Sequence, residues 1–171
     1  MKWAILFTVF MICTMFGVWV DEDRRKRVVE LGRLIYVFEV LKAEIDYQLT
    51  PLKEACINVS THEKEGIKDL FTSFADKLEK KESLNIKEMW LDAIDDSRVK
   101  LHLKNEDYIV LASFADSCGY LDKNMQRRNL EMLIEKLEHI RVTSEAQYEK
   151  SSKLNKTLGM LVGAVIVIMF I

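Results

Sequence analysis

Hydrophobic residues form an unbroken run at each end of the chain, and between these runs they recur at the spacing of helices. Residues 3–20 contain no Asp, Glu, Lys, Arg or His, and neither do residues 157–171. As helices, the runs would be roughly 27 Å and 22 Å long, against a bilayer hydrocarbon core of about 30 Å. The pattern predicts a transmembrane helix in residues 1–20 and a second, shorter one in residues 157–171.

A cleaved signal peptide is the alternative interpretation of the N-terminal run. Such a peptide has a positively charged start, a shorter apolar segment and a cleavage site with small residues. Here Lys2 is the only charge before the run, no Ala-x-Ala sequence follows it, and four basic residues come soon after it. We therefore interpret the run as a membrane anchor.

Basic residues lie beside both runs, on the side of the middle segment. They are Arg24, Arg25, Lys26 and Arg27 after the first run and Lys150, Lys153 and Lys156 before the second. Lysine and arginine are enriched on the cytoplasmic side of membrane helices. The topology predicted from these residues has two spans, with residues 21–156 in the cytoplasm. The stems of Lys153 and Lys156 can lie along lipid and lengthen the second span.

Residues 21–156 are predicted to form one all-helical domain, a six-helix bundle. Apolar positions three and four residues apart mark the helices, and no segment alternates in the manner of a strand. The segment holds one proline and three glycines, too few for the turns of a many-stranded β domain. The apolar pattern places the six helices at residues 31–45, 52–59, 63–80, 86–94, 105–118 and from about 122 onward.

Two helix starts carry local signals. Thr50 has the side chain of an N-cap, and Pro51 follows at the first helical position, where its missing N–H is not needed. Asn85 and Glu88 have the spacing of a capping box. The sequence therefore predicts a helix that starts at Pro51 and another that starts after Asn85.

The last two helices differ from the others in their apolar pattern. Residues 108–115 are apolar on nearly all sides, which predicts that the helix at 105–118 is the central one, with Gly119 as its C-terminal stop. The sixth helix meets no glycine or proline before Gly159, so it is predicted to continue into the second membrane helix.

The middle segment is acidic, whereas its two ends are basic. Residues 28–149 contain 24 acidic and 17 basic side chains. This balance disfavours binding to nucleic acid, and it offers a surface to a basic partner. The cysteines Cys13, Cys56 and Cys118 are far apart and form no C-x-x-C motif, which indicates reduced thiols.

No motif of a catalytic, cofactor or metal site is present in the sequence. The histidines His62, His102 and His139 are scattered, and the pair Glu135 and His139 is more typical of a solvated helix face than of a metal site. We predict a protein that is not an enzyme and has no catalytic residues, cofactor or metal.

Gly159 and Gly163 form a G-x-x-x-G motif within the second apolar run. In a membrane helix, two small residues at this spacing allow another helix to approach closely. Glycine is also common in membrane helices without any such role. The pair is a candidate for membrane-helix packing.

Two strings of residues give the chain a resemblance to a known family. Residues 44–55 read Glu-Ile-Asp-Tyr-Gln-Leu-Thr-Pro-Leu-Lys-Glu-Ala, and residues 114–122 read Phe-Ala-Asp-Ser-Cys-Gly-Tyr-Leu-Asp. Together with the two terminal apolar runs, they resemble the stage III sporulation protein AB family of endospore-forming bacteria. The resemblance covers the whole chain.

That family is in turn similar to the F-type domain of platform proteins in type II secretion and type IV pilus machines, a six-helix bundle before a membrane helix. Residues 50–55 fit the F-type pattern. Of the later Gly-Glu-x-x-Gly-x-Leu segment only Gly119 and Leu121 fit, because Ala115 and Asp116 replace Gly-Glu. F-type platforms usually carry two bundles, so a single bundle implies self-association into a homo-oligomer or another subunit.

The resemblance implies a non-enzymatic platform in a secretion-like channel between mother cell and forespore. The protein would lie in the mother-cell membrane around the forespore, with its bundle in the mother-cell cytoplasm. Its partners would be the lipid bilayer, a secretion-type ATPase (stage III sporulation protein AA) and other membrane subunits. A membrane-tethered helical scaffold or regulator unrelated to secretion remains an alternative.

The residues around the Pro51 turn are the candidates for a partner interface. Glu44 and Glu54 have the charge to face a basic partner, and they are equally suited to capping helices and holding the turn. The candidate interface residues are Glu44, Tyr47, Thr50, Pro51, Glu54 and Gly119.

Overall fold

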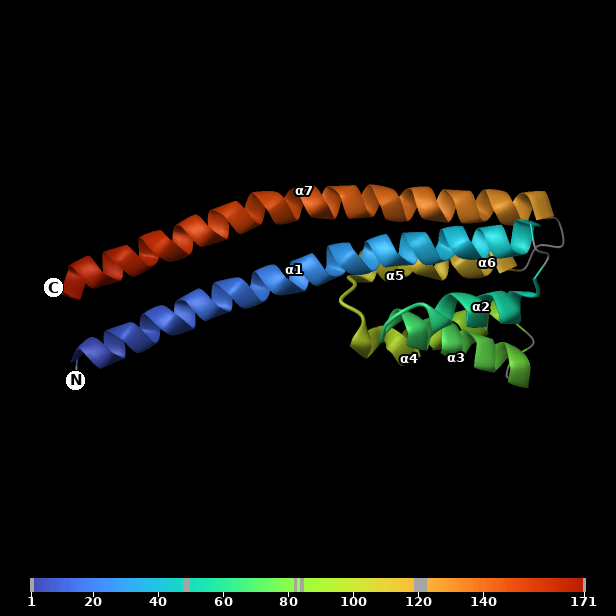
Figure 1. Cartoon of the computed structure of the whole chain (residues 1–171), viewed down its shortest axis with the longest axis horizontal. Coiled ribbons are helices and arrows are strands. Elements are labelled where there is room, and N and C mark those ends of the chain that lie inside the picture. Colours follow the sequence, from blue (N-terminus) through green and yellow to red (C-terminus); the bar gives the residue numbers. More distant parts are fainter. Residues whose placement is uncertain (1, 48–49, 82, 84, 119–122, 171) are drawn as a thin grey trace. The chain divides into compact units, whose positions relative to one another are not determined.

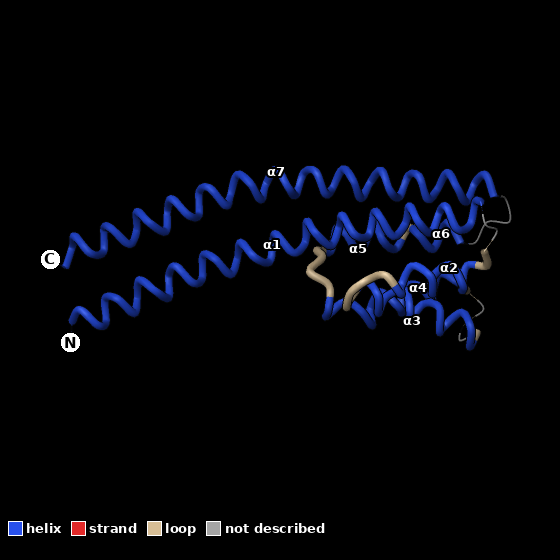
Figure 2. Tube along the Cα trace, in the orientation of Figure 1, coloured by secondary structure: helices blue, strands red, loops and turns tan. Residues whose placement is uncertain are grey.

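The computed structural model is helical throughout the part of the chain that it describes (Figure 2). It describes the backbone of residues 2–47, 50–81, 83, 85–118 and 123–170. Side chains are described for residues 22–46, 50–81, 83, 85–116, 118 and 124–151. The chain divides into two compact units, one of Met1–Val28 with Val142–Ile171 and one of Val29–Arg141.

The longest helices are the first and the last. Helix α1 spans Lys2–Tyr47 and helix α7 spans Lys123–Phe170, each without interruption, as the absence of internal proline predicts for α7 (Figure 1). Among the residues whose side chains are described, no helical window is long and apolar enough to cross a bilayer. The two apolar runs fall outside those residues, so the two spans remain a prediction.

The second unit is the predicted six-helix bundle. Its helices between α1 and α7 are α2 (Leu52–Thr61), α3 (Ile67–Lys80), α4 (Ile86–Ser97), α5 (Asn105–Ala112) and α6 (Phe114–Cys118), with a 3₁₀ turn, η1, at Arg98–Lys100. The predicted fifth helix is broken at Ser113 into α5 and α6. There the backbone N–H of Ser113 bonds to the carbonyl of Val110 at 3.1 Å, and its hydroxyl bonds to the same oxygen at 2.6 Å, which tightens the turn.

A cluster of five aromatic rings forms the centre of the bundle. Trp90 of α4 lies 4.7 Å from Phe114, 4.9 Å from Phe74 and 5.7 Å from Phe71, measured between ring centroids. Phe38 of α1 lies 5.1 Å from Phe114 and 5.6 Å from Phe71. All five side chains are almost fully buried, so burial of apolar area and edge-to-face ring contacts hold four elements together here.

The prediction that the helix at 105–118 is central is wrong. Trp90 of α4 occupies the middle of the aromatic cluster, and α5 packs with Tyr108 and Leu111 inward. The opposite side of α5 is open, because Ile109 is 73% exposed. The stretch 108–115, apolar on nearly all sides, is therefore covered on only part of its circumference by the residues that the structure describes.

The two predicted helix starts have different outcomes. At α4, Asn85 is the N-cap, since its side-chain oxygen accepts from the backbone N–H of Lys87 at 3.0 Å. Glu88 accepts from the Ser83 hydroxyl at 2.6 Å, and Ser83 accepts from the backbone N–H of Asn85. The Ser83 hydroxyl thus bridges the backbone N–H of Asn85 and the carboxylate of Glu88, the two groups that a capping box would join directly.

At α2 the predicted cap is wrong. The N-cap position is held by Pro51, and the helix begins at Leu52. The hydroxyl of Thr50 instead donates a hydrogen bond to Oε2 of Glu44 at 2.9 Å. A charged carboxylate is a strong hydrogen-bond acceptor, and the Thr50 hydroxyl bonds to that of Glu44 on the preceding helix. Thr50 therefore links α1 to the turn and does not cap α2.

Candidate docking surfaces

The helix ends that carry the described interface candidates lie at one end of the bundle. The last turn of α1, the start of α2, the end of α6 and the start of α7 all lie at that end of the second unit (Figure 1). Glu44, Thr50, Pro51 and Glu54 are described, whereas the side chain of Tyr47 and all of Gly119 lie outside the described residues. The described parts of the two strings that carry the family resemblance, residues 44–47, 50–55 and 114–118, thus lie at the same end of the second unit.

Glu44 is engaged within the chain. Its Oε2 atom accepts hydrogen bonds from the Thr50 hydroxyl at 2.9 Å and from the Asn58 side-chain amide at 3.3 Å. The backbone N–H of Thr50 also bonds to the carbonyl of Glu44 at 3.3 Å. These bonds connect the end of α1 to the turn and to α2, which favours the structural role for Glu44.

Glu54 differs from Glu44 in both exposure and contacts. It lies exposed in the first turn of α2, where a negative charge interacts favourably with the helix dipole. Pro51 beside it is also exposed. Of the two acidic residues predicted at the interface, Glu54 is therefore the one whose carboxylate is accessible to a partner.

The predicted topology residues are not all alike. Arg24, Arg25 and Lys26 are exposed, as is Lys150, but Arg27 is only 6% exposed. From the sequence, all four basic residues after the first run were predicted to act alike as topology determinants. The side chains of Lys153 and Lys156, and the pair Gly159 and Gly163, fall outside the residues whose side chains are described.

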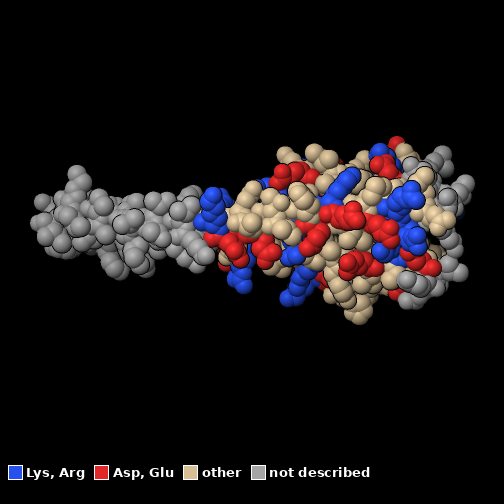
Figure 3. Space-filling model, turned by 90° about the horizontal axis from the view of Figure 1, so that it is seen from above, with Lys and Arg blue, Asp and Glu red and all other residues tan. Residues whose placement is uncertain are grey.

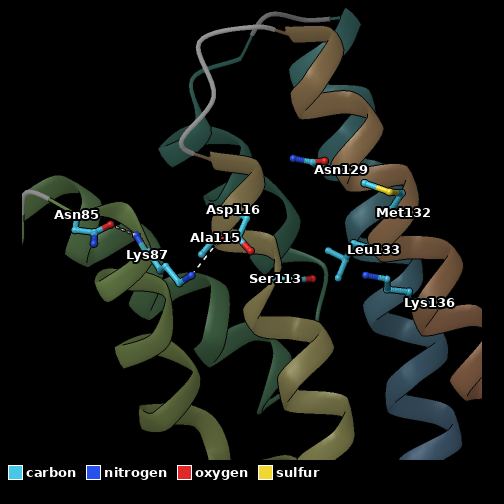
Figure 4. A pocket seen from close by; sticks show the side chains of 9 residues that line it. All are labelled: Asn85, Lys87, Ser113, Ala115, Asp116, Asn129, Met132, Leu133 and Lys136. Carbon is cyan, nitrogen blue, oxygen red and sulfur yellow. Dashed lines mark hydrogen bonds and ion pairs between the residues drawn. The ribbon is translucent and has the colours of Figure 1, made fainter.

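A groove that sequence reasoning missed lies in the second unit, between α4 and α7 with the α5–α6 segment between them. Its volume is about 520 Å³. Asn129, Met132 and Lys136 project from α7 toward the α5–α6 segment (Figure 4). The groove is lined by Asn85, Lys87, Ser113, Ala115, Asp116, Asn129, Met132, Leu133 and Lys136.

The groove lining has three charged side chains, two lysines and one aspartate. Lys87 of α4 pairs with Oδ1 of Asp116 at 3.1 Å, and both side chains are more than half exposed. Lys136 is exposed and has no acidic partner among the residues that the structure describes. With Asp116 balanced by Lys87, the charge of Lys136 is uncompensated in an otherwise acidic domain.

Elsewhere in the bundle, the described residues offer no reactive centre. Burial raises the pKa of the Cys56 thiol well above its usual range and raises that of Cys118 to about 12, so both thiols stay protonated at neutral pH. Nδ1 of His102 lies 2.8 Å from Oε1 of Glu30, and the backbone N–H of His102 bonds to the same carboxylate. No group of three metal-ligating side chains occurs among the described residues.

Acidic and basic side chains are interspersed on the face of the molecule in Figure 3. An acidic docking patch would appear as a continuous area of one charge. On this face the net negative charge of the middle segment is spread out, so ordinary solubility accounts for it.

The described residues define an all-α helical-bundle protein. The sequence model of the family described as "Stage III sporulation protein AB (spore_III_AB)" matches residues 2–171. The chain therefore belongs to the stage III sporulation protein AB family, a family of sporulation proteins.

Two individual relatives support this assignment. The chain is 27% identical over 167 residues to stage III sporulation protein AB of Bacillus subtilis (strain 168), covering 96% of this chain and 97% of that protein. It is also similar to a solved structure of stage III sporulation protein AB, with a TM-score of 0.68 and 26% identity. That match covers 72% of this chain and 97% of the solved one.

Proposed function

We propose that this protein is a non-enzymatic platform component of a secretion-like channel between mother cell and forespore. In this role it couples a cytoplasmic secretion-type ATPase, stage III sporulation protein AA, to membrane subunits of the channel. The observation that carries the proposal is the family match over residues 2–171, which includes the bundle and both apolar runs.

The proposed location is the mother-cell membrane around the forespore. Two spans, in residues 1–20 and 157–171, would hold the chain, with the bundle on the cytoplasmic side. This topology is supported by the two charge-free runs and by the exposed cations Arg24, Arg25, Lys26 and Lys150 beside them.

The platform role needs a stable body with free surfaces. The aromatic cluster around Trp90 supplies the first, because it ties α1, α3, α4 and α6 into one core. Exposed residues at the bundle end, such as Pro51 and Glu54, and the groove between α4 and α7 supply the second. Catalysis is not part of the proposal, since a platform acts by binding.

Co-purification tests the proposal directly. The full chain, carrying an affinity tag, is extracted from membranes of sporulating cells in mild detergent and probed for the ATPase and for membrane subunits of the channel. We expect the ATPase to co-purify with it and spore development to stop after engulfment when the gene is deleted. Normal spore formation in the deletion strain, or absence of the ATPase from a complex that retains other partners, would favour the alternative of a scaffold unrelated to secretion.

A reporter fusion tests the topology separately. A cytoplasmic reporter inserted after Lys81, between α3 and α4, is expected to be active, and an export-dependent reporter at the same place inactive. The reverse pattern would contradict the proposed orientation.

A further inference from the structure

The exposed side of α5 lies beside the groove. The second half of α5, residues 108–112, has no charged side chain, and the bundle buries Tyr108 and Leu111 while leaving Ile109 at 73% exposure. Ser113 directly follows α5 and keeps a helical backbone conformation, so it lies on the same side as Ile109, four residues earlier, and it lines the groove. The bare side of α5 and the groove therefore form one surface.

The two helices that flank α5 extend the apolar part of this surface. On α4, Leu91 is exposed and lies one turn after Lys87 of the groove lining. On α7, Met132 lines the groove at 45% exposure, and Met125 is exposed two turns before it. Positions seven apart on a helix share a face, so α7 presents both methionines to the same side. Methionine adapts its shape to a binding partner at low cost.

Cationic and amide groups border the apolar strip. Lys136 follows Met132 by one turn, and Asn129 precedes it by one turn (Figure 4). Lys87 stands on the opposite wall, where its pairing with Asp116 leaves that carboxylate neutralised. The uncompensated charge of Lys136 makes the groove complementary to a carboxylate.

We propose that this surface binds an amphipathic helix of another protein, with apolar residues at helical spacing and an Asp or Glu one turn from them. The partner's apolar side would cover Ile109, Leu91 and Met132, which completes the burial of α5, and its carboxylate would meet Lys136. The strip from Met125 to Lys136 on α7 is about 16 Å long, enough for three turns of a helix. The proposal does not require that this partner be the ATPase.

Site-specific crosslinking in cells tests the proposal. The photoreactive residue p-benzoylphenylalanine replaces Met132 in the full chain, and crosslinked peptides from membranes of sporulating cells are sequenced by mass spectrometry. We expect a peptide from another protein in which the crosslinked apolar residue has a second apolar residue three or four positions away and an Asp or Glu within one turn.

Two pairs of matched variants show whether the contact uses the proposed surface. Ile109→Asp and Lys136→Glu are each expected to lower the crosslinking yield at least about fivefold, because one buries a charge against the partner and the other repels its carboxylate. Val99→Asp, at a valine that is 95% exposed on η1, and Arg128→Glu, on α7 outside the groove lining, are expected to change the yield less than about twofold.

A charge exchange completes the test. Replacing the partner's acidic residue with Lys should lower the yield, and combining that change with Lys136→Glu should restore it. The proposal is overturned if no crosslinked adduct forms, or if the adduct is to lipid or to a second copy of this chain. It is also overturned if the crosslinked peptide has no carboxylate. Equal losses in the groove and control variants, or no recovery on charge exchange, overturn it as well. Binding of the ATPase is scored separately by co-purification, so the two proposals can fail independently.

Discussion

The indole nitrogen of Trp90 on α4 donates a hydrogen bond to the carbonyl oxygen of Leu111 on α5, at 2.9 Å. The carbonyl lies at the C-terminal end of α5, next to the break at Ser113, and the backbone N–H of Ser113 also points to it. One side chain thus fills the aromatic core and also satisfies a buried backbone group.

Replacing Trp90 with Phe removes the indole donor from the buried Leu111 carbonyl and leaves a cavity in the aromatic cluster. We expect Trp90→Phe to lower the free energy of unfolding by about 2–4 kcal/mol. Thermal unfolding of the full chain in detergent, followed by circular dichroism, measures the change. The control is Val99→Ala, at a side chain exposed on η1, which should stay within about 0.5 kcal/mol of the wild type. Equal stability of the two variants would contradict the central place of Trp90.

Replacement by alanine is expected to change the free energy of unfolding in opposite directions at Gly66 and at Gly32. Gly66 precedes α3 with a φ of +90°, and a Cβ there would lie 3.0 Å from Cδ2 of Leu101 and 3.1 Å from the carbonyl oxygen of Lys100. Gly66→Ala should lower the free energy of unfolding by about 1–3 kcal/mol. Gly32 lies within α1, and a Cβ added there would be 3.6 Å from Cδ of Arg141 on α7, an ordinary contact. Gly32→Ala is therefore expected to raise the free energy of unfolding by about 0.5–1 kcal/mol. Urea denaturation of the two variants is the measurement, and destabilisation by both would refute the distinction.

Substitutions of Glu44 and Glu54 are expected to have different effects, Glu44 on the stability of the fold and Glu54 on binding of a partner. Glu44→Ala removes the acceptor for Thr50 and Asn58, so it should lower the free energy of unfolding by about 1 kcal/mol. Glu54→Lys changes an exposed charge and should cost less than about 1 kcal/mol, through the helix dipole.

The binding readout for this pair is the amount of ATPase that co-purifies with the full chain. If Glu54 contacts the partner, Glu54→Lys lowers this amount while the melting temperature changes little. Parallel loss of ATPase and of melting temperature in Glu54→Lys would show instead that Glu54 serves the fold.

The ion pair of Asp69 and Lys100 predicts a pH dependence of stability. The Lys100 ammonium lies 2.7 Å from Oδ2 of Asp69, and its hydrogen bond, the largest cause, holds the pKa of Asp69 below the usual range. The folded state therefore binds the Asp69 proton more weakly than the unfolded chain does. The pair stabilises the fold above the unfolded-state pKa of about 4, and this contribution is lost as pH falls through the lower folded-state pKa.

Urea denaturation at pH 7 and at pH 3 tests this dependence. Lys100→Met should lower stability at pH 7, and the difference from wild type should shrink toward pH 3. Lys64→Met removes an exposed lysine that has no acidic partner among the described residues, so it is expected to show no such trend. A difference for Lys100→Met that is the same at both pH values would contradict the assignment to Asp69.

Local features of the fold were predictable from sequence because they depend on neighbours along the chain. Apolar spacing predicted the helices of the bundle, and Asn85 marked the start of α4 correctly, since an N-cap involves only the next few residues. Thr50 was assigned wrongly as a cap, because the competing acceptor, Glu44, belongs to another helix. The strings around Pro51 and Gly119 indicated the family, and the comparisons confirm it.

By itself, then, the sequence determined the helical class, the family and the two charge-free ends with their basic flanks. Only the tertiary structure decided which side of each helix is covered. Residues 108–115 are apolar on nearly all sides, and periodicity cannot show that Ile109 would stay exposed while Trp90 takes the centre. The groove was equally hidden, because Lys87, Asp116 and Lys136 come from three helices that only folding brings together. Helix formation depends on contacts three and four residues apart, whereas a surface is made by residues distant in the chain.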